Sequence, residues 1–120
     1  MLVSTFSVPI EVGDQQGRRY IPLQALVDTG SSHTAIPQDV LNQLGILPRG
    51  QRRHRLADNS VVFYQWGEAR IRLMGVDISV VVVFMPLGSD PLLGASTLED
   101  FGLAVDPIAE RLVEVDQLLK

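Results

Sequence analysis

The stretch that decides the fold lies at residues 25–32 and reads Ala25-Leu26-Val27-Asp28-Thr29-Gly30-Ser31-Ser32. An apolar run typical of a buried strand ends at Asp28, and a small hydroxyl residue and a glycine follow at once. Gly30 permits a tight turn and the close approach of a second chain or a substrate. The pattern therefore predicts an acidic side chain presented at the end of a buried strand. The plainer alternative is that Asp28 only begins an Asx-type turn.

Strand-like runs lie before this segment, and a short helix follows it. Apolar and β-branched residues predict strands at residues 6–12 and 20–27, with a turn at residues 13–17 between them. After Pro37 the apolar residues recur at helical spacing, and Gly45 suits the position after a helix end. One short helix is therefore expected at residues 37–44.

The second half of the chain is again rich in strands. Strands are expected at residues 53–57, 61–66, 69–73, 78–85, 104–105 and 112–115. The first two form a hairpin with its tip at residues 58–60, and residues 78–85 are expected to be buried on both faces. Leu92-Leu93-Gly94 leads into a second short helix, which Ser96 or Thr97 could cap. Many short strands and two small helices indicate an all-β barrel or sandwich.

Length and composition bound the class of protein. A chain of 120 residues, 46% hydrophobic and 20% charged, predicts one folded domain over residues 1–120. Without cysteine it has no disulfide, thiolate zinc site or Cys nucleophile. No targeting segment is visible, and the most apolar run, residues 78–85, is far shorter than a membrane span. We therefore expect a cytoplasmic protein with no membrane partner, and the net charge of −4 argues against non-specific nucleic-acid binding.

A basic cluster lies in the middle of the chain, where Arg49, Arg52, Arg53 and Arg55 surround His54. We interpret the cluster as a solvated strand edge, whose charges discourage aggregation. Binding of nucleic acid or an acidic substrate is the alternative, but no interleaved aromatics or nucleic-acid fold accompany the cluster. No nucleic-acid partner is therefore expected.

Other catalytic chemistries find little support in the sequence. His33 and His54 lack metal-ligand spacing, so no metal site is expected. Ser31 and His33 are too close in sequence to form a Ser-His-Asp triad on a strand-end turn. An Asp after a buried strand can also accept a phosphoryl group, but that chemistry needs several βαβ units that this chain does not supply.

With Leu92-Leu93-Gly94 at its expected distance from Asp28-Thr29-Gly30, the chain resembles the retropepsin-like aspartic proteases, in their bacterial type. The resemblance to this single-lobed family covers residues 6–115. It implies a small closed β-barrel of the retropepsin-like acid protease type with one or two short helices. It also implies a homodimeric aspartic endopeptidase that acts on polypeptides and needs no cofactor.

The resemblance assigns roles around the motif. Asp28 would be catalytic together with the Asp28 of a second subunit, because one chain supplies a single catalytic aspartate. Thr29 would link the two catalytic loops, and Gly30 would shape the loop and present its carbonyl to the substrate backbone. Ser31 would contact substrate and donate a hydrogen bond to the Asp28 carboxylate. Leu92-Leu93-Gly94 would brace the catalytic turn from behind.

The hairpin tip, Ala57-Asp58-Asn59-Ser60, would be a substrate-binding flap that closes over an extended peptide. It departs from the glycine-rich flap of the retroviral members. Ser32 and Ala95 stand where those members have an acid and an arginine that pair, so the dimer needs other contacts, such as residues 1–7 and 112–115. The alternative function is a retropepsin-like dimerisation or peptide-binding module with weak or no catalysis.

Overall fold

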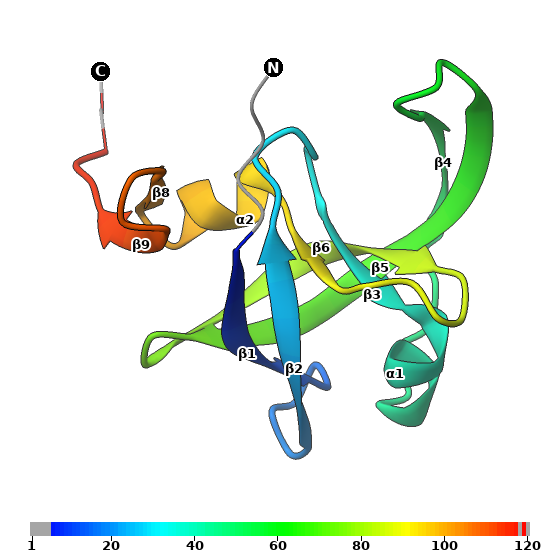
Figure 1. The fold of residues 1–120 in the computed structure, drawn as a ribbon. Helices are drawn as coiled ribbons and strands as arrows, with labels where there is room; N and C mark the ends of the chain where they lie inside the picture. Colours follow the sequence, from blue (N-terminus) through cyan, green and yellow to red (C-terminus); the bar gives the residue numbers. More distant parts are fainter. Residues whose placement is uncertain (1–5, 118, 120) are drawn as a thin grey trace.

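The computed structural model describes residues 6–117 and 119, and over that range the chain folds mainly into strands (Figure 1). The strands are β1 (Ser7–Gly13), β2 (Tyr20–Val27), β3 (Thr34–Pro37), β4 (Gly50–Arg55), β5 (Val61–Leu73), β6 (Val76–Met85), β7 (Leu92–Leu93), β8 (Leu103–Asp106) and β9 (Arg111–Glu114). The helices are α1 (Gln38–Gln43) and α2 (Ala95–Asp100). The mostly-β class with few short helices, predicted from the sequence, is confirmed.

Seven strands form one sheet in the order β1-β2-β7-β3-β6-β5-β4. β1 also pairs with β5, with Val12 opposite Ile71. Strand pairing therefore links β5 back to β1, the first strand of the sheet. The short strand β7 lies between β2 and β3, parallel to β2 and antiparallel to β3. β8 and β9 form a separate antiparallel pair. The insertion of β7 brings residues 92–94 beside the end of β2, although they are far apart in sequence.

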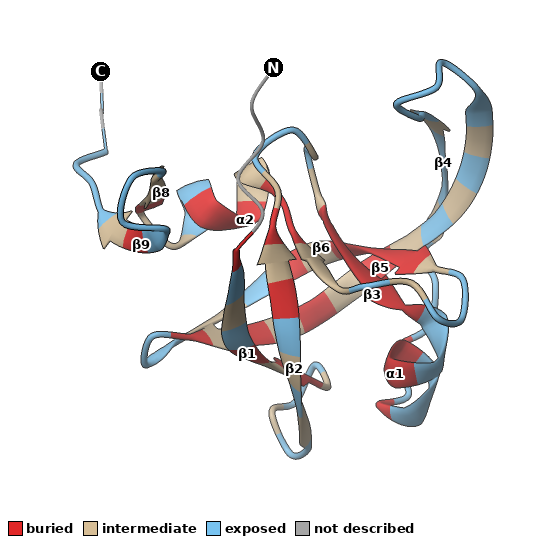
Figure 2. Ribbon diagram, in the orientation of Figure 1, coloured by how far each residue is buried: buried red, intermediate tan, exposed pale blue. Residues whose placement is uncertain are grey.

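The core lies where alternate residues of these strands point to the same side. Val12, Ala25, Val27, Ile71 and Leu93 have no exposed surface at all. Figure 2 shows this buried band across β2, β3 and β5, while β4 and the neighbouring end of β5 are half-buried or exposed. Within β2, Ala25 and Val27 are therefore buried, and Asp28 follows immediately.

The first helix follows the sequence prediction closely. Pro37 precedes α1 at the N-cap position, and Gly45 follows it with a left-handed φ of 70°. Glycine adopts this conformation without steric cost, which is why it suits the end of a helix.

Several element boundaries differ from the sequence prediction, among them that of β4, which spans Gly50–Arg55 where the sequence predicts a strand at residues 53–57. Residues 61–66 and 69–73 form one continuous strand, β5, because Gly67 lets the strand pass close to other parts of the chain: a Cβ there would lie 3.0 Å from the Leu47 carbonyl oxygen. α2 begins at Ala95 after Gly94, without a side-chain cap from Ser96 or Thr97. Its first N–H groups find backbone partners instead, as described below.

The burial of β6 differs in part from the prediction, and the terminal strands agree with it only where the structure describes them. β6 is not buried on both faces throughout, since Ser79 is exposed and Val81 is half-buried. Residues 112–115 largely coincide with β9, as predicted. Of the terminal segment expected at residues 1–7, residues 1–5 lie outside the described residues.

Candidate functional site

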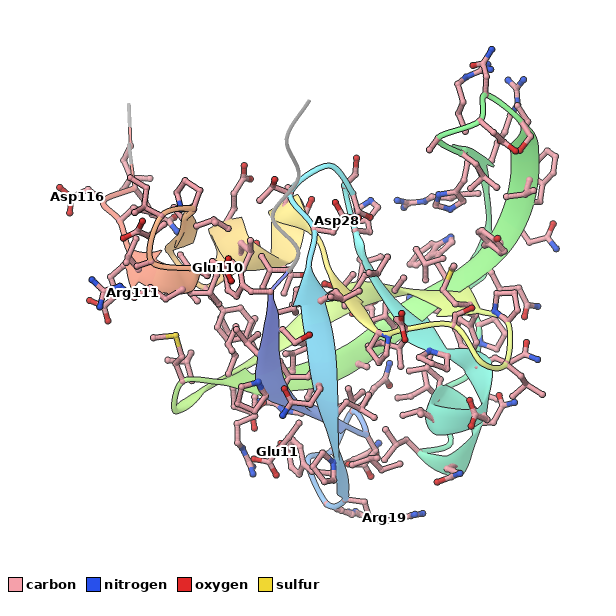
Figure 3. All side chains as sticks on the ribbon, viewed as in Figure 1. Glu11, Arg19, Asp28, Glu110, Arg111 and Asp116 are labelled. Atoms are coloured by element: carbon pink, nitrogen blue, oxygen red, sulfur yellow. The ribbon has the colours of Figure 1, made fainter. Side chains whose placement is uncertain are left out.

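Asp28 stands at the point where β2 leaves the core. Val27 is fully buried and Asp28 is half-buried. The Asp28 backbone N–H donates to the Leu93 carbonyl at 3.0 Å, which extends the parallel pairing of β2 and β7 by one residue. Figure 3 shows Asp28 in the loop after β2, on the side of the molecule toward which the β4–β5 hairpin curves.

The turn that follows is closed by the aspartate itself. The Gly30 N–H donates to Oδ1 of Asp28 at 3.0 Å, and the Ser31 N–H donates to the Asp28 carbonyl at 3.1 Å. One carboxylate oxygen is therefore oriented by the backbone, as in the Asx-type turn considered above. Thr29 and Gly30 are exposed on the outside of this turn.

The Ser31 hydroxyl differs from its expected arrangement. Its Oγ donates to the His33 carbonyl at 2.9 Å, whereas donation to the Asp28 carboxylate was expected. A serine hydroxyl reaches a backbone carbonyl two residues away without rearrangement, and this local bond competes with more distant partners. In the folded chain Ser31 therefore stabilises the loop between β2 and β3.

Helix α2 begins on the Asp28 loop. The Ala95 N–H donates to the Ser31 carbonyl at 2.8 Å, and the Ser96 N–H donates to the Ser32 carbonyl at 3.0 Å. The first N–H groups of a helix lack partners within the helix, and here loop carbonyls supply them. This explains why α2 needs no capping side chain, and it fixes the loop to the helix.

A buried pair of threonines lies behind the same turn. Oγ1 of Thr34 and Oγ1 of Thr97 are 2.6 Å apart, and both residues are almost fully buried. Thr34 Oγ1 also accepts the Gly94 N–H at 3.2 Å. The sequence does not predict this pair, because nothing in the local pattern links two threonines so far apart.

Gly94 explains why the second motif needs a glycine. A Cβ at this position would lie 2.4 Å from both the carbonyl carbon and the oxygen of His33. Since these are backbone atoms, they could not move aside without shifting the loop after Asp28. The two sequence motifs therefore meet in space, with residues 92–94 directly behind the Asp28 turn.

The tip of the β4–β5 hairpin forms a self-contained turn. The Leu56 N–H donates to the Ser60 carbonyl at 2.8 Å, and Asn59 adopts a left-handed φ of 71°. The hydroxyl of Ser60 and its N–H both donate to Asp58 Oδ1, and these bonds lower the pKa of the Asp58 carboxyl. The predicted substrate-binding residues 57–60 are all exposed, and the tip is turned to solvent.

Outside the Asp28 loop, the described residues form no second site of comparable definition. Across residues 6–117 and 119, no group of three or more His, Asp or Glu side chains could hold a metal ion. Nor does any helix in the described part of the chain have the length and apolar character to cross a membrane. A groove of about 540 Å³ lies elsewhere, lined by Pro9, Ile10, Glu11, Pro22, Leu23, Gln24, Arg72, Met74 and Gly75.

Comparison with known proteins agrees with the meeting of these motifs. The family described as "gag-polyprotein putative aspartyl protease" matches residues 17–100, well over half of the chain. No curated protein sequence matches this chain significantly.

Solved viral structures share the fold at low sequence identity. The EIAV protease complexed with the inhibitor HBY-793 superimposes with a TM-score of 0.54 at 20% identity, covering 82% of this chain and 88% of that one. The protease of simian foamy virus (mac) gives 0.54 at 17% identity, covering 78% and 94%. The foamy viral protease-reverse transcriptase, in complex with an RNA/DNA hybrid, gives 0.61 at 15% identity. It covers 97% of this chain, which spans only 13% of that longer polypeptide.

Proposed function

Because the chain belongs to the gag-polyprotein aspartyl protease family, and so to the retropepsin-like aspartic proteases, we propose that it is an aspartic endopeptidase. One observation carries the proposal: a half-buried carboxylate at the end of a buried strand, backed by Leu92-Leu93-Gly94. The hydrogen bond between the Asp28 N–H and the Leu93 carbonyl joins the two motifs that define the resemblance.

The chemistry requires two carboxylates, and one chain supplies one at this site. We therefore propose a homodimer in which two Asp28 side chains face each other across a two-fold axis. Two carboxylates about 3 Å apart do not both ionise, so the pair shares one proton. The ionised member takes a proton from a water molecule that attacks the peptide carbonyl, and the protonated member hydrogen-bonds the developing oxyanion.

The neighbouring residues have supporting roles in this proposal. Thr29, which is exposed beside Asp28, links the two catalytic loops across the dimer axis. Gly30 presents its carbonyl to an extended substrate, and Ser31 lies beside the bound peptide. The hairpin tip, residues 57–60, closes over the substrate and excludes water.

The remaining predictions belong to the same proposal. A closed barrel of the retropepsin type is supported by the pairing of β1 with both β2 and β5. A single domain over residues 1–120, a cytoplasmic location, and the lack of a cofactor, a nucleic-acid partner and a membrane partner stay predictions. The bacterial type also stays a prediction, since the structures named above are viral.

A second function deserves a test because two features depart from the retroviral members, one in the dimer contacts and one in the flap. Ser32 and Ala95 do not form the ion pair of the retroviral members, and the hairpin tip lacks their glycines. A retropepsin-like module that dimerises or binds peptides, with little or no turnover, would keep the fold and lose the dyad.

The first experiment compares the wild-type chain with Asp28→Asn on an unstructured protein substrate, from mildly acidic to neutral pH. We expect the rate of cleavage to fall by about 10³-fold in the variant, because general acid–base catalysis is lost. Asp39→Asn, an exposed change on α1, is the matched control and should cleave at the wild-type rate. Circular dichroism verifies that all three proteins remain folded.

The outcomes separate the two functions. Equal cleavage by wild type and Asp28→Asn would contradict the proposal. A folded wild-type protein that cleaves nothing would favour the peptide-binding module. If the dyad forms between subunits, a large excess of Asp28→Asn protein should also suppress wild-type activity by forming mixed dimers.

A further inference from the structure

The β4–β5 hairpin has two different faces, because side chains alternate along a strand. The register pairs Arg52 with Tyr64 and His54 with Val62. One face, which we name the inner face, carries the following side chains: Arg52, His54, Val62, Tyr64 and Trp66. The opposite, outer face carries the following side chains, all of them exposed: Gln51, Arg53, Arg55, Val61, Phe63 and Gln65.

His54 is the less exposed of the two basic residues on the inner face. Its Nε2 is buried and has no hydrogen-bond partner among the described residues. Burial lowers the pKa of His54, and the charges of His33 and Arg52 lower it further. His33 belongs to the loop after Asp28, and the hairpin that carries the inner face curves toward the side of the molecule on which that loop lies (Figure 1).

The inner face holds its basic groups on aromatic rings. The Arg52 guanidinium lies 4.5 Å from the centroid of the Trp66 ring, and the His54 ring lies 5.6 Å from that of Tyr64. Stacking on an aromatic face orients a guanidinium and leaves its N–H groups at the edge free to donate.

Arg52, like Arg53 on the outer face, has no polar partner, whereas the other two arginines of the hairpin region are paired. Arg49 forms a salt bridge with Glu68 at 2.8 Å, and Arg55 donates to Asn59 Oδ1 at 3.0 Å. Within residues 6–117, Arg52 makes neither a salt bridge nor a side-chain hydrogen bond. The inner face therefore presents an oriented but unpaired guanidinium next to an unpartnered imidazole.

We propose that this inner face binds an acidic side chain of the polypeptide substrate, with Arg52 as the main recognition residue and His54 and His33 beside it. The inference rests on the proposed function, since it assigns a substrate class to the same site. A carboxylate is the ligand that a planar guanidinium recognises best, through two parallel N–H donors. The acidic residue lies within a few positions of the cleaved bond, because the hairpin that carries the inner face curves toward the side of the molecule on which the Asp28 loop lies (Figure 1).

The test measures binding, so that it does not depend on turnover. The probes are fluorescent peptides with a reduced, non-cleavable bond between two apolar residues, and with Glu or Gln at one of the four positions on either side. At the position that meets Arg52, we expect the Glu peptide to bind about fivefold more tightly than the Gln peptide. Arg52→Gln should remove this preference, and Arg52→Lys should retain part of it.

Arg53→Gln is the matched control, because it removes the same charge from the outer face of the same strand. It should keep the preference for Glu. Equal binding of Glu and Gln peptides at every position, absence of binding by any peptide, or an equal loss in Arg53→Gln would each overturn the inference. Cleavage by wild type but not by Asp28→Asn would still support the proposed function in those cases. A Glu preference in a protein that cleaves nothing would support the inference and contradict the protease.

Discussion

At the scale of single residues, the site is built by backbone groups that fix one acidic side chain. The Gly30 N–H holds one oxygen of Asp28, and the Leu93 carbonyl holds its N–H. The polar side chains that matter most for this geometry are themselves buried: Thr34 and Thr97. Their hydroxyls hydrogen-bond to each other, and Oγ1 of Thr34 also accepts the Gly94 N–H directly behind the Asp28 turn.

Thr34→Val tests this buried pair. The substitution keeps the shape of the side chain but leaves the Gly94 N–H and the Thr97 hydroxyl without their partner. We expect the free energy of unfolding to fall by about 1–3 kcal/mol, the usual cost of an unsatisfied buried group. Urea denaturation measures this change. Thr34→Ser, which keeps the hydroxyl, should lose less, and an equal loss would show that the methyl group matters more than the hydrogen bonds.

At the scale of elements, the site depends on segments that are distant in sequence and packed at van der Waals contact. α2 begins on carbonyls of the Asp28 loop, and β7 is inserted between β2 and β3. The contact between Gly94 and the His33 backbone is the tightest point of this arrangement. A change at Gly94 therefore acts on Asp28 although the two residues do not belong to the same element.

Gly94→Ala should lower both stability and cleavage. Its Cβ would collide with backbone atoms of His33, and overpacking of this kind costs about 1–3 kcal/mol or more. Gly88→Ala is the comparison, because Gly88 has a left-handed φ of 82° and open space around its Cβ position. Both variants should unfold at a lower urea concentration than the wild-type protein, but only Gly94→Ala should reduce the rate of peptide cleavage per folded molecule. Unchanged activity in Gly94→Ala would argue that a shift of the His33 backbone does not affect the position of Asp28.

At the scale of the whole molecule, a polar network joins strands from both halves of the chain. Tyr20 donates to Asp77, and Arg70 pairs with the same carboxylate at 2.9 Å. Arg72 lies 3.8 Å over the Tyr20 ring and also reaches Asp77. β2, β5 and β6 are therefore tied together far from Asp28.

Asp77 should make stability depend on acidic pH. Burial raises the pKa of Asp77, but hydrogen bonds from Tyr20 and Arg70 and the charges of Arg70 and Arg72 outweigh burial, so the pKa lies below its ordinary value of 3.8. A carboxyl with a lowered pKa stabilises the fold above its unfolded-state pKa, and that stability is lost as the pH falls through the folded-state pKa.

Asp77→Asn should therefore reduce the free energy of unfolding at pH 7 by about 1–3 kcal/mol, since hydrogen bonds to a charged group are lost. The difference from wild type should shrink as the pH falls below 3.8, the window set by the lowered pKa. Urea titrations across this range measure it. Asp100→Asn, an exposed change at the end of α2, should stay within about 0.5 kcal/mol of wild type at every pH.

Local sequence patterns were sufficient to predict β2, α1, the hairpin, and Asp28 at the end of a buried strand. Each of these depends on neighbours in sequence: alternation for strands, Pro37 and Gly45 for the helix, and a polar residue after an apolar run. The resemblance further predicted that Leu92-Leu93-Gly94 would lie behind the Asp28 turn, and hydrogen bonds now join the two.

Other features depend on contacts between distant segments, and these features follow only from the folded structure. The Thr34–Thr97 bond and the backbone capping of α2 each involve groups whose nearness no local pattern encodes. The same holds for the orientation of the hairpin, because strand alternation defines two faces but does not say which one is turned toward the Asp28 loop. Local sequence patterns predicted the acidic residue and its strand, whereas packing determined what surrounds that residue, because hydrogen bonds and van der Waals contacts require a closeness in space that only the folded chain supplies.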